Sequence, residues 1–208
     1  MKGFILSTTL VREEDKIVKV LTTSEILTLY RFYGARHSQL QWGNLIDFVV
    51  ESNPKGGIAR LRTPIQLPLL PIPTPLSVKL QWEEFFSFLN FHLRGVTTLP
   101  PFYYHLLFQM GRELTFRPPI RVVVEGLFEI FHFEGRLPPF GKCAICHSPL
   151  TEWSGIERGS LRPVHPSCLP NLPLFPTLPL GELYLHRKSL LLSHSHLFSL
   201  WKWITSFQ

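Results

Sequence analysis

Residues 3–62 contain five short apolar stretches separated by turn-forming residues, a pattern that predicts a small all-β fold. The stretches are GFILSTTL (3–10), KIVKVLT (16–22), ILTLYRFY (26–33), LIDFVVE (45–51) and GIARLR (57–62). The segments between them, such as REED (12–15) and SNPKGG (52–57), are rich in residues that favour turns. Five strands with no helical pattern between them predict a small antiparallel β-barrel of the OB type. A small β-sandwich or an SH3-like barrel is the alternative that the strand count leaves open.

Aromatic and basic residues are concentrated in TLYRFYGARHSQLQWG (28–43). In an alternating strand Tyr30 and Phe32 share one side, and Arg31 and Tyr33 occupy the other. Cations on such a barrel can follow a phosphate backbone while aromatic rings stack on bases. The candidate DNA-binding residues lie on or beside the predicted barrel: Arg12, Lys16, Lys19, Tyr30, Arg31, Phe32, Tyr33, Arg36, Trp42, Arg60 and Arg62. Arg36 is the strongest single candidate because it lies on a loop that begins with Gly34 and not in the interior of a strand. The alternative is that these charges only solvate a barrel whose aromatics are buried.

The composition favours a folded protein with a polyanionic partner. The chain has 208 residues, of which 45% are hydrophobic, and a net charge of +6. Lys and Arg outnumber Asp and Glu by nine to six in residues 1–76 and by six to three in residues 141–208, whereas the middle is neutral. No apolar run approaches the roughly 20 residues that span a bilayer, and the first residues do not form a signal peptide. We therefore expect a cytoplasmic protein without a membrane partner.

The period of the apolar residues changes after the barrel. The segment TPIQLPLLPIPTP (63–75) carries five prolines, which disfavour a central strand or a helix, and its apolar residues suggest that it packs along a surface. Three helices are predicted between residues 77 and 134, the first with Ser77 as its N-cap. A final amphipathic helix carries Trp201 and Trp203, and it either docks on the helices or offers a partner surface. The sequence thus predicts an α+β multidomain protein with an OB-type barrel (1–63), a Pro-rich linker (64–76), a helical domain (77–140), a zinc ribbon (141–172) and a C-terminal segment packing on the helical domain (173–208).

All three cysteines lie close together in the sequence, in the spacing of a metal site. Cys143 and Cys146 form a C-x2-C knuckle, and His165 and Cys168 follow as H-x2-C. Three thiolates and one imidazole in a closed tetrahedral shell suit a structural Zn²⁺. Two alternatives remain open, namely three unrelated buried cysteines, and His147 in place of His165 as the fourth ligand.

No catalytic motif emerges from the sequence. His132-Phe133-Glu134 followed by a C-x-x-C is similar to the zinc nucleobase deaminase signature. Only eight residues separate Glu134 from Cys143, however, which is too few for the intervening elements of that fold. Phosphate-binding glycine loops and a G-x-S-x-G motif are also lacking. We therefore expect a protein that is not an enzyme.

The N-terminal residues and the ribbon together resemble the RecO family of bacterial recombination mediators. The stretch LVREEDKIVKVLTTSE (10–25) ahead of LYRFYGARHS (29–38) is similar to the opening pattern of that family, and an ERG sequence (157–159) precedes the second knuckle of the ribbon. The order of barrel, helices and ribbon also fits. The chain departs from the family in its H-x2-C knuckle, where C-x2-C is usual, in its shorter length and in the proline-rich segment at 63–75.

The resemblance implies a non-enzymatic protein of DNA repair and recombination. It would bind single- and double-stranded DNA, anneal complementary strands and, with RecR, assist RecA in replacing single-strand-binding protein. Its location would be cytoplasmic and associated with the nucleoid. Single-strand-binding protein would be a further partner. The main alternative is a zinc-containing protein-interaction adaptor with incidental DNA affinity, and a second is a nucleic-acid enzyme whose active site carries no recognisable motif.

Overall fold

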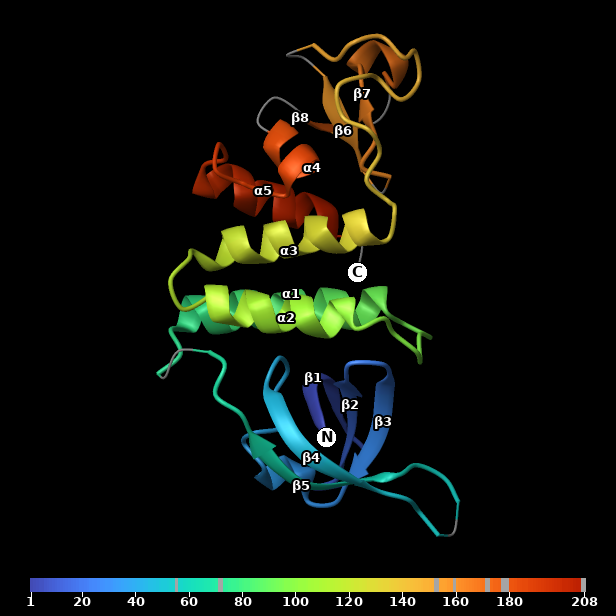
Figure 1. Cartoon of the computed structure of the whole chain (residues 1–208), viewed down its shortest axis with the longest axis vertical. Coiled ribbons are helices and arrows are strands. Elements are labelled where there is room, and N and C mark those ends of the chain that lie inside the picture. Colours follow the sequence, from blue (N-terminus) through green and yellow to red (C-terminus); the bar gives the residue numbers. More distant parts are fainter. Residues whose placement is uncertain are drawn as a thin grey trace. The chain divides into compact units, whose positions relative to one another are not determined.

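The computed structural model describes residues 1–54, 56–70, 73–151, 154–158, 160–170, 173–176 and 180–206. The chain forms two compact units, Met1–Pro119 and Ile120–Gln208. Figure 1 shows the elements of both units in chain order. Within the parts of the chain that are described, no helix has the length and apolarity needed to cross a membrane.

The first unit begins with a closed five-stranded barrel, which confirms the predicted fold class. Its strands are β1 (Lys2–Leu10), β2 (Lys16–Leu21), β3 (Ile26–Arg31), β4 (Leu45–Glu51) and β5 (Arg60–Gln66). They close in the order β1-β2-β3-β5-β4, and only the pairing of β3 with β5 is parallel. This closed barrel is of the OB type.

The last barrel strand lies further along the chain than the sequence predicts. The prediction placed it within residues 57–62, whereas β5 runs from Arg60 to Gln66 and includes Pro64. The register against β4 shifts between Asp47 and Val49, and neither Thr63 nor Pro64 is among the paired residues. A proline is tolerated at such a bulge because no ladder hydrogen bond is required of it.

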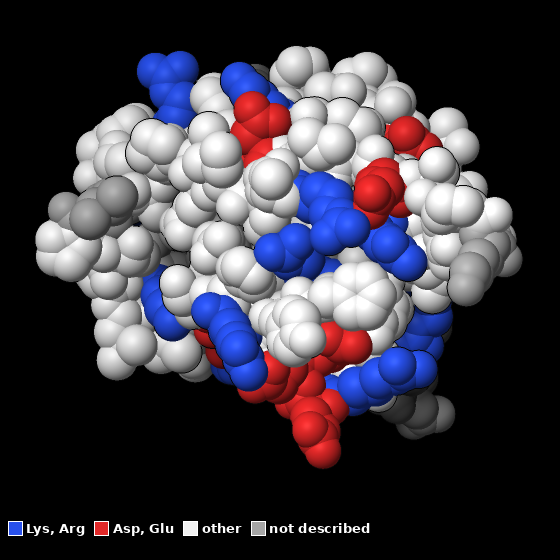
Figure 2. Space-filling view, turned by 90° about the horizontal axis from the view of Figure 1, so that it is seen from below, with Lys and Arg blue, Asp and Glu red and all other residues white. Residues whose placement is uncertain are grey.

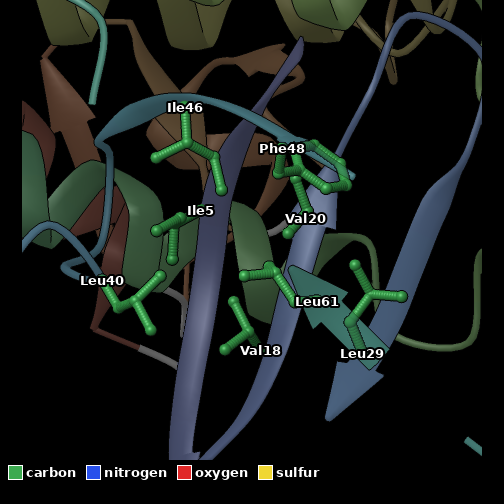
Figure 3. Packing of buried hydrophobic residues seen from close by; sticks show 8 residues of the cluster. All are labelled: Ile5, Val18, Val20, Leu29, Leu40, Ile46, Phe48 and Leu61. Carbon is green, nitrogen blue, oxygen red and sulfur yellow. The ribbon is translucent and has the colours of Figure 1, made fainter. Parts of the chain in front are cut away.

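Because side chains alternate along a strand, every second side chain points into the barrel (Figure 3). The core comprises eight side chains, none more than 1% exposed: Ile5, Val18, Val20, Leu29, Leu40, Ile46, Phe48 and Leu61. The outer faces of the strands carry polar and aromatic residues and also exposed aliphatic ones such as Val49 and Ile65.

Two helices, α1 (Leu76–His92) and α2 (Phe102–Glu113), pack on the barrel within the first unit. The indole Nε1 of Trp82, in α1, donates a hydrogen bond to the Gly43 carbonyl at 3.1 Å. A Cβ at Gly43 would lie 2.4 Å from that nitrogen, and Gly43 has φ +80°, so the close approach requires glycine. The ring of Phe4 in β1 contacts Phe86 and Tyr104 from the two helices, at 6.1 and 5.4 Å between ring centroids.

The proline-rich segment packs on α2, as predicted from its apolar residues. Leu69 lies so close to Gly111 that a Cβ there would be 2.5 Å from the leucine side chain. Residues 71 and 72 of this segment are outside the described residues. The predicted N-cap is wrong, because α1 begins at Leu76 and Pro75 occupies the N-cap position.

Among its described residues, the second unit has three α-helices, a short 3-10 helix (Pro166–Cys168) and a small sheet. The helices are α3 (Pro119–Phe133), α4 (Gly181–His186) and α5 (His194–Thr205). The sheet has the order β7-β6-β8, formed by β6 (Gly155–Glu157), β7 (Pro163–Val164) and β8 (Leu174–Pro176). The three helices predicted between residues 77 and 134 are thus present, but the first two belong to one compact unit and the third to the other. The predicted division into five segments stays a prediction.

A buried polar network joins α3 to the connection between α4 and α5. Glu125 accepts hydrogen bonds from the backbone N–H and the hydroxyl of Ser189, at 2.9 and 2.7 Å. Arg121 donates to the carbonyl of Leu192 at 2.7 Å. The predicted final helix is α5, which begins after Ser193 and carries Trp201 in the core and Trp203 half-buried.

Candidate functional site

Three segments distant in sequence meet at one end of the barrel. In the strand register Leu10 pairs with Lys16, Lys16 with Arg31, and Tyr30 with Arg60. We call the end of the barrel where these pairs lie the Arg31 end. Phe4, which contacts the helices, lies at the opposite end of β1. The loop between β1 and β2, the residues after β3 and the start of β5 therefore lie close together at the Arg31 end.

The side chains at the Arg31 end form a pocket of about 300 Å³. We call it the Phe32 pocket, and it is lined by Arg12, Tyr30, Phe32, Asn53, Ile58 and Arg60. The rings of Tyr30 and Phe32 meet edge to face with centroids 4.9 Å apart, so these two aromatics do share one side as predicted. The guanidinium of Arg60 lies over the Phe32 ring, 5.2 Å from its centroid. Such a pairing of aromatic ring and cation suits both the base and the phosphate of a nucleotide.

The acidic turn between β1 and β2 closes against the residues that follow β3. The Asp15 carboxylate accepts hydrogen bonds from the Tyr30 hydroxyl and, at 2.8 Å, from the Tyr33 backbone N–H. The bond from Tyr30 lowers the pKa of Asp15 and raises the pKa of Tyr30. Glu14 forms an ion pair with Arg36 at 2.7 Å. The acidic turn thus holds the aromatic and basic segment in place.

A second hollow, of about 390 Å³, lies beside this turn. It is lined by Arg12, Glu13, Glu14, Asp15 and Tyr33, and we call it the acidic hollow. Arg12 lines both hollows. The guanidinium of Arg36 lies over the Tyr33 ring, 5.2 Å from its centroid.

Arg31 points to the inner side of the barrel, on the same face of β3 as the core residue Leu29. Its guanidinium donates to the Leu61 carbonyl at 3.1 Å and lies 2.8 Å from Nε2 of His37. Burial and then the charge of Arg62 lower the pKa of Arg31. Burial likewise lowers the pKa of His37, with Arg31 as the second cause. The Arg31 side chain therefore covers this end of the core. Because part of its guanidinium is used in these contacts, fewer of its N–H donors remain for a ligand.

The other predicted cations are divided between the Arg31 end and elsewhere. The Glu51 carboxylate lies 2.7 Å from Arg62 and 3.8 Å from Arg60, so it partly neutralises the charge of these two arginines. Figure 2 shows Lys and Arg side chains gathered in the middle of the view, with acidic side chains beside them. Lys16 stands at the Arg31 end, whereas Lys19 pairs with Ser7 and Thr28 further along the strands.

Trp42 is the predicted aromatic that the structure separates from the pocket. It precedes Gly43, which contacts Trp82 of α1 and bonds to Ile5. The sequence prediction also missed Asn53 and Ile58, because the loop between β4 and β5 reads only as a turn. The sequence likewise did not indicate that Asp15 bonds to Tyr30 and Tyr33, or that Glu14 pairs with Arg36.

The structure brings together the four residues of the predicted metal site. One ligand atom each from Cys143, Cys146, His165 and Cys168 lies within 4.8 Å of the others, so the group can hold a metal ion. A tetrahedral zinc ion has bonds of about 2.0–2.3 Å to its four ligand atoms. The ligand atoms around such an ion lie farther apart from one another than one bond length, at separations within the 4.8 Å found here. Among the described residues His165, and not His147, completes this group.

Hydrogen bonds orient the ligands of this group. Nδ1 of His165 lies 3.3 Å from the Cys146 sulfur, and Nε2 lies 3.0 Å from the Pro149 carbonyl. With its proton on Nε2, bonded to that carbonyl, the neutral ring presents Nδ1 to a metal. Burial raises the pKa of the Cys143 thiol, but backbone N–H groups, first that of Cys146, outweigh it and lower this pKa to about 6. Burial, with the neighbouring thiols, raises the pKa of Cys168 to about 11, and a bound cation would displace such a proton.

The ribbon is anchored to the helices of the second unit. Arg158 donates from Nε to the Trp203 carbonyl at 3.0 Å, and its guanidinium lies 4.4 Å from the centroid of the Trp203 ring. The buried hydroxyl of Tyr184 donates to the Leu161 carbonyl at 2.6 Å. Arg158 belongs to the ERG sequence noted above, of which Gly159 is outside the described residues. These contacts favour a structural role for the ribbon.

Comparison with known proteins adds one finding. Residues 1–70 match the family model described as RecO N terminal. The match covers the whole barrel, from β1 to the end of β5. No curated protein sequence matches the chain.

Proposed function

We propose that this protein is a non-enzymatic DNA-binding protein of recombinational repair, because residues 1–70 match the family model described as RecO N terminal. This match confirms the resemblance over the barrel. In this proposal it binds single- and double-stranded DNA, anneals complementary strands and, together with RecR, assists RecA in displacing single-strand-binding protein. Such a role places it in the cytoplasm, at the nucleoid.

The observation that carries the proposal is the Phe32 pocket at the Arg31 end of a RecO-type barrel. Phe32 is 39% exposed, and Arg12 and Arg60 stand beside it. Arginines attract phosphates regardless of sequence, and every base has a face that stacks on an aromatic ring. Binding is therefore expected to be largely independent of sequence.

In the same proposal the cluster of Cys143, Cys146, His165 and Cys168 holds a structural Zn²⁺. All four ligand positions come from the protein, which leaves no open position for a substrate. The ion would tie the knuckle of residues 143–146 to the segment 165–168 and so maintain the ribbon. Near-stoichiometric zinc in protein purified under reducing conditions without chelators supports this assignment, and its absence would refute it.

Fluorescence anisotropy with a labelled single-stranded oligonucleotide, titrated with salt, tests the DNA-binding proposal. We expect tight binding at low salt whose logarithm falls linearly with the logarithm of salt concentration, by about 0.7 for each phosphate contacted. An annealing assay with complementary strands follows. Absence of binding at low salt, together with tight binding to a protein partner, would replace the proposal with the adaptor function.

A further inference from the structure

The two hollows at the Arg31 end adjoin at Arg12 but differ in chemistry. Three carboxylates line the acidic hollow, at Glu13, Glu14 and Asp15. Among the described residues that line the Phe32 pocket, none is acidic. A nucleic-acid strand carries a negative charge at every phosphate, so the acidic hollow repels it and the Phe32 pocket admits it.

The walls of the Phe32 pocket are held in position before any ligand binds. The hydroxyl of Tyr30 is bonded to Asp15, and the Tyr30 ring meets the edge of Phe32. Arg60 lies over the Phe32 ring and is paired only loosely with Glu51, at 3.8 Å. Arg60 therefore covers one face of the Phe32 ring, and a flat ligand would meet the part of the aromatic pair that Arg60 leaves open. Because these side chains are already in contact, little ordering is required on binding.

We propose that the Phe32 pocket takes one unstacked base of a single-stranded nucleic acid, while Arg12 and Arg60 at its rim contact the neighbouring phosphates. Its volume of about 300 Å³ is at the lower end of small-molecule pockets, which suits a single base. A base within a duplex is stacked and paired, and it would have to be extruded first. The pocket therefore distinguishes single strands from duplexes.

This inference rests on the proposed function. Of the four aromatic residues predicted to contact DNA, it keeps two as stacking residues. Tyr33 is 58% exposed, but it lines the acidic hollow, where three carboxylates repel a phosphate backbone. Trp42 is not among the residues that line the Phe32 pocket, and the next residue, Gly43, contacts Trp82 of α1. Only Tyr30 and Phe32 then contact the base.

Matched leucine variants test the assignment. Phe32→Leu and Tyr33→Leu each remove one exposed aromatic ring from neighbouring positions outside the core. We expect Phe32→Leu to weaken anisotropy-detected binding of single-stranded DNA about 5- to 150-fold, the range for loss of one stacked base, and to leave duplex binding unchanged. Tyr33→Leu is expected to change neither, and Phe32→Tyr, which keeps a stacking face, to restore single-strand binding.

A strand of abasic sugar and phosphate units gives a second measurement. Wild-type protein should bind it about as weakly as Phe32→Leu binds the normal strand, and with an unchanged salt slope, because the phosphate contacts remain. Equal effects of Phe32→Leu and Tyr33→Leu, or equal binding of normal and abasic strands, would overturn the base pocket while DNA binding by the wild type persists. Failure of the proposed function looks different, since the wild-type protein would then bind neither strand at low salt, and the base pocket would fall with it.

Discussion

The ion pair between Glu14 and Arg36 should reduce the contribution of Arg36 to DNA binding. The two groups are 2.7 Å apart, and the Arg36 side chain is 67% exposed. A phosphate that approaches Arg36 must displace or share the Glu14 carboxylate, so few counterions are released there. Each full phosphate contact on a single strand adds about 0.7 to the salt slope, which corresponds to about 2.6-fold in affinity between 50 and 200 mM salt. We expect Glu14→Gln to steepen the slope by about this 0.7.

Salt titrations of single-stranded DNA binding, with Glu13→Gln as the control, measure this effect. Glu13 lies in the same turn, and its replacement changes the net charge equally, but it forms no ion pair with Arg36 in the structure. Arg36→Gln should have little effect on the wild type and should flatten the slope by about 0.7 in the Glu14→Gln background. Equal shifts for the Glu13 and Glu14 variants, or the full effect of Arg36→Gln in the wild type, would refute the argument.

Three further predictions concern stability and the metal. Trp82→Phe removes the indole donor and leaves a backbone carbonyl before β4 unpaired, so the free energy of unfolding, measured in urea by circular dichroism, should fall by about 2 kcal/mol. Cys146→Ser should abolish near-stoichiometric zinc in metal analysis, whereas His147→Ala should retain it, because only the former residue belongs to the ligand group. The hydrogen bond from Tyr30 holds the pKa of Asp15 below its ordinary value of 3.8, so the stability that it contributes is present above that pH and is lost as pH falls through the lowered pKa. Asp15→Asn should therefore destabilise the protein at neutral pH and less so in acid, and a constant difference in acid titrations would contradict this.

Several features of the barrel could be predicted from local pattern. Strand alternation depends on residues two apart, and turns depend on a few neighbouring residues, so β1 to β4 lie close to their predicted positions. The same holds for the two halves of the metal group, because the spacing within each knuckle is set by a short turn. The strand β5 was misplaced because its proline is accommodated by a bulge, which depends on the register of β4.

Local periodicity and spacing predicted a five-stranded barrel, the main helices and the cluster of cysteines with a histidine, although they left open whether His147 or His165 was the fourth ligand. The folded structure was needed to show which candidate residues lie together. It placed Gly43, the neighbour of Trp42, against Trp82 of α1, brought Arg31 beside His37 and paired Glu14 with Arg36. These outcomes depend on strand register and on contacts between residues far apart in the chain. A shift of one residue in register exchanges the two faces of a strand, and no short stretch of sequence specifies that register.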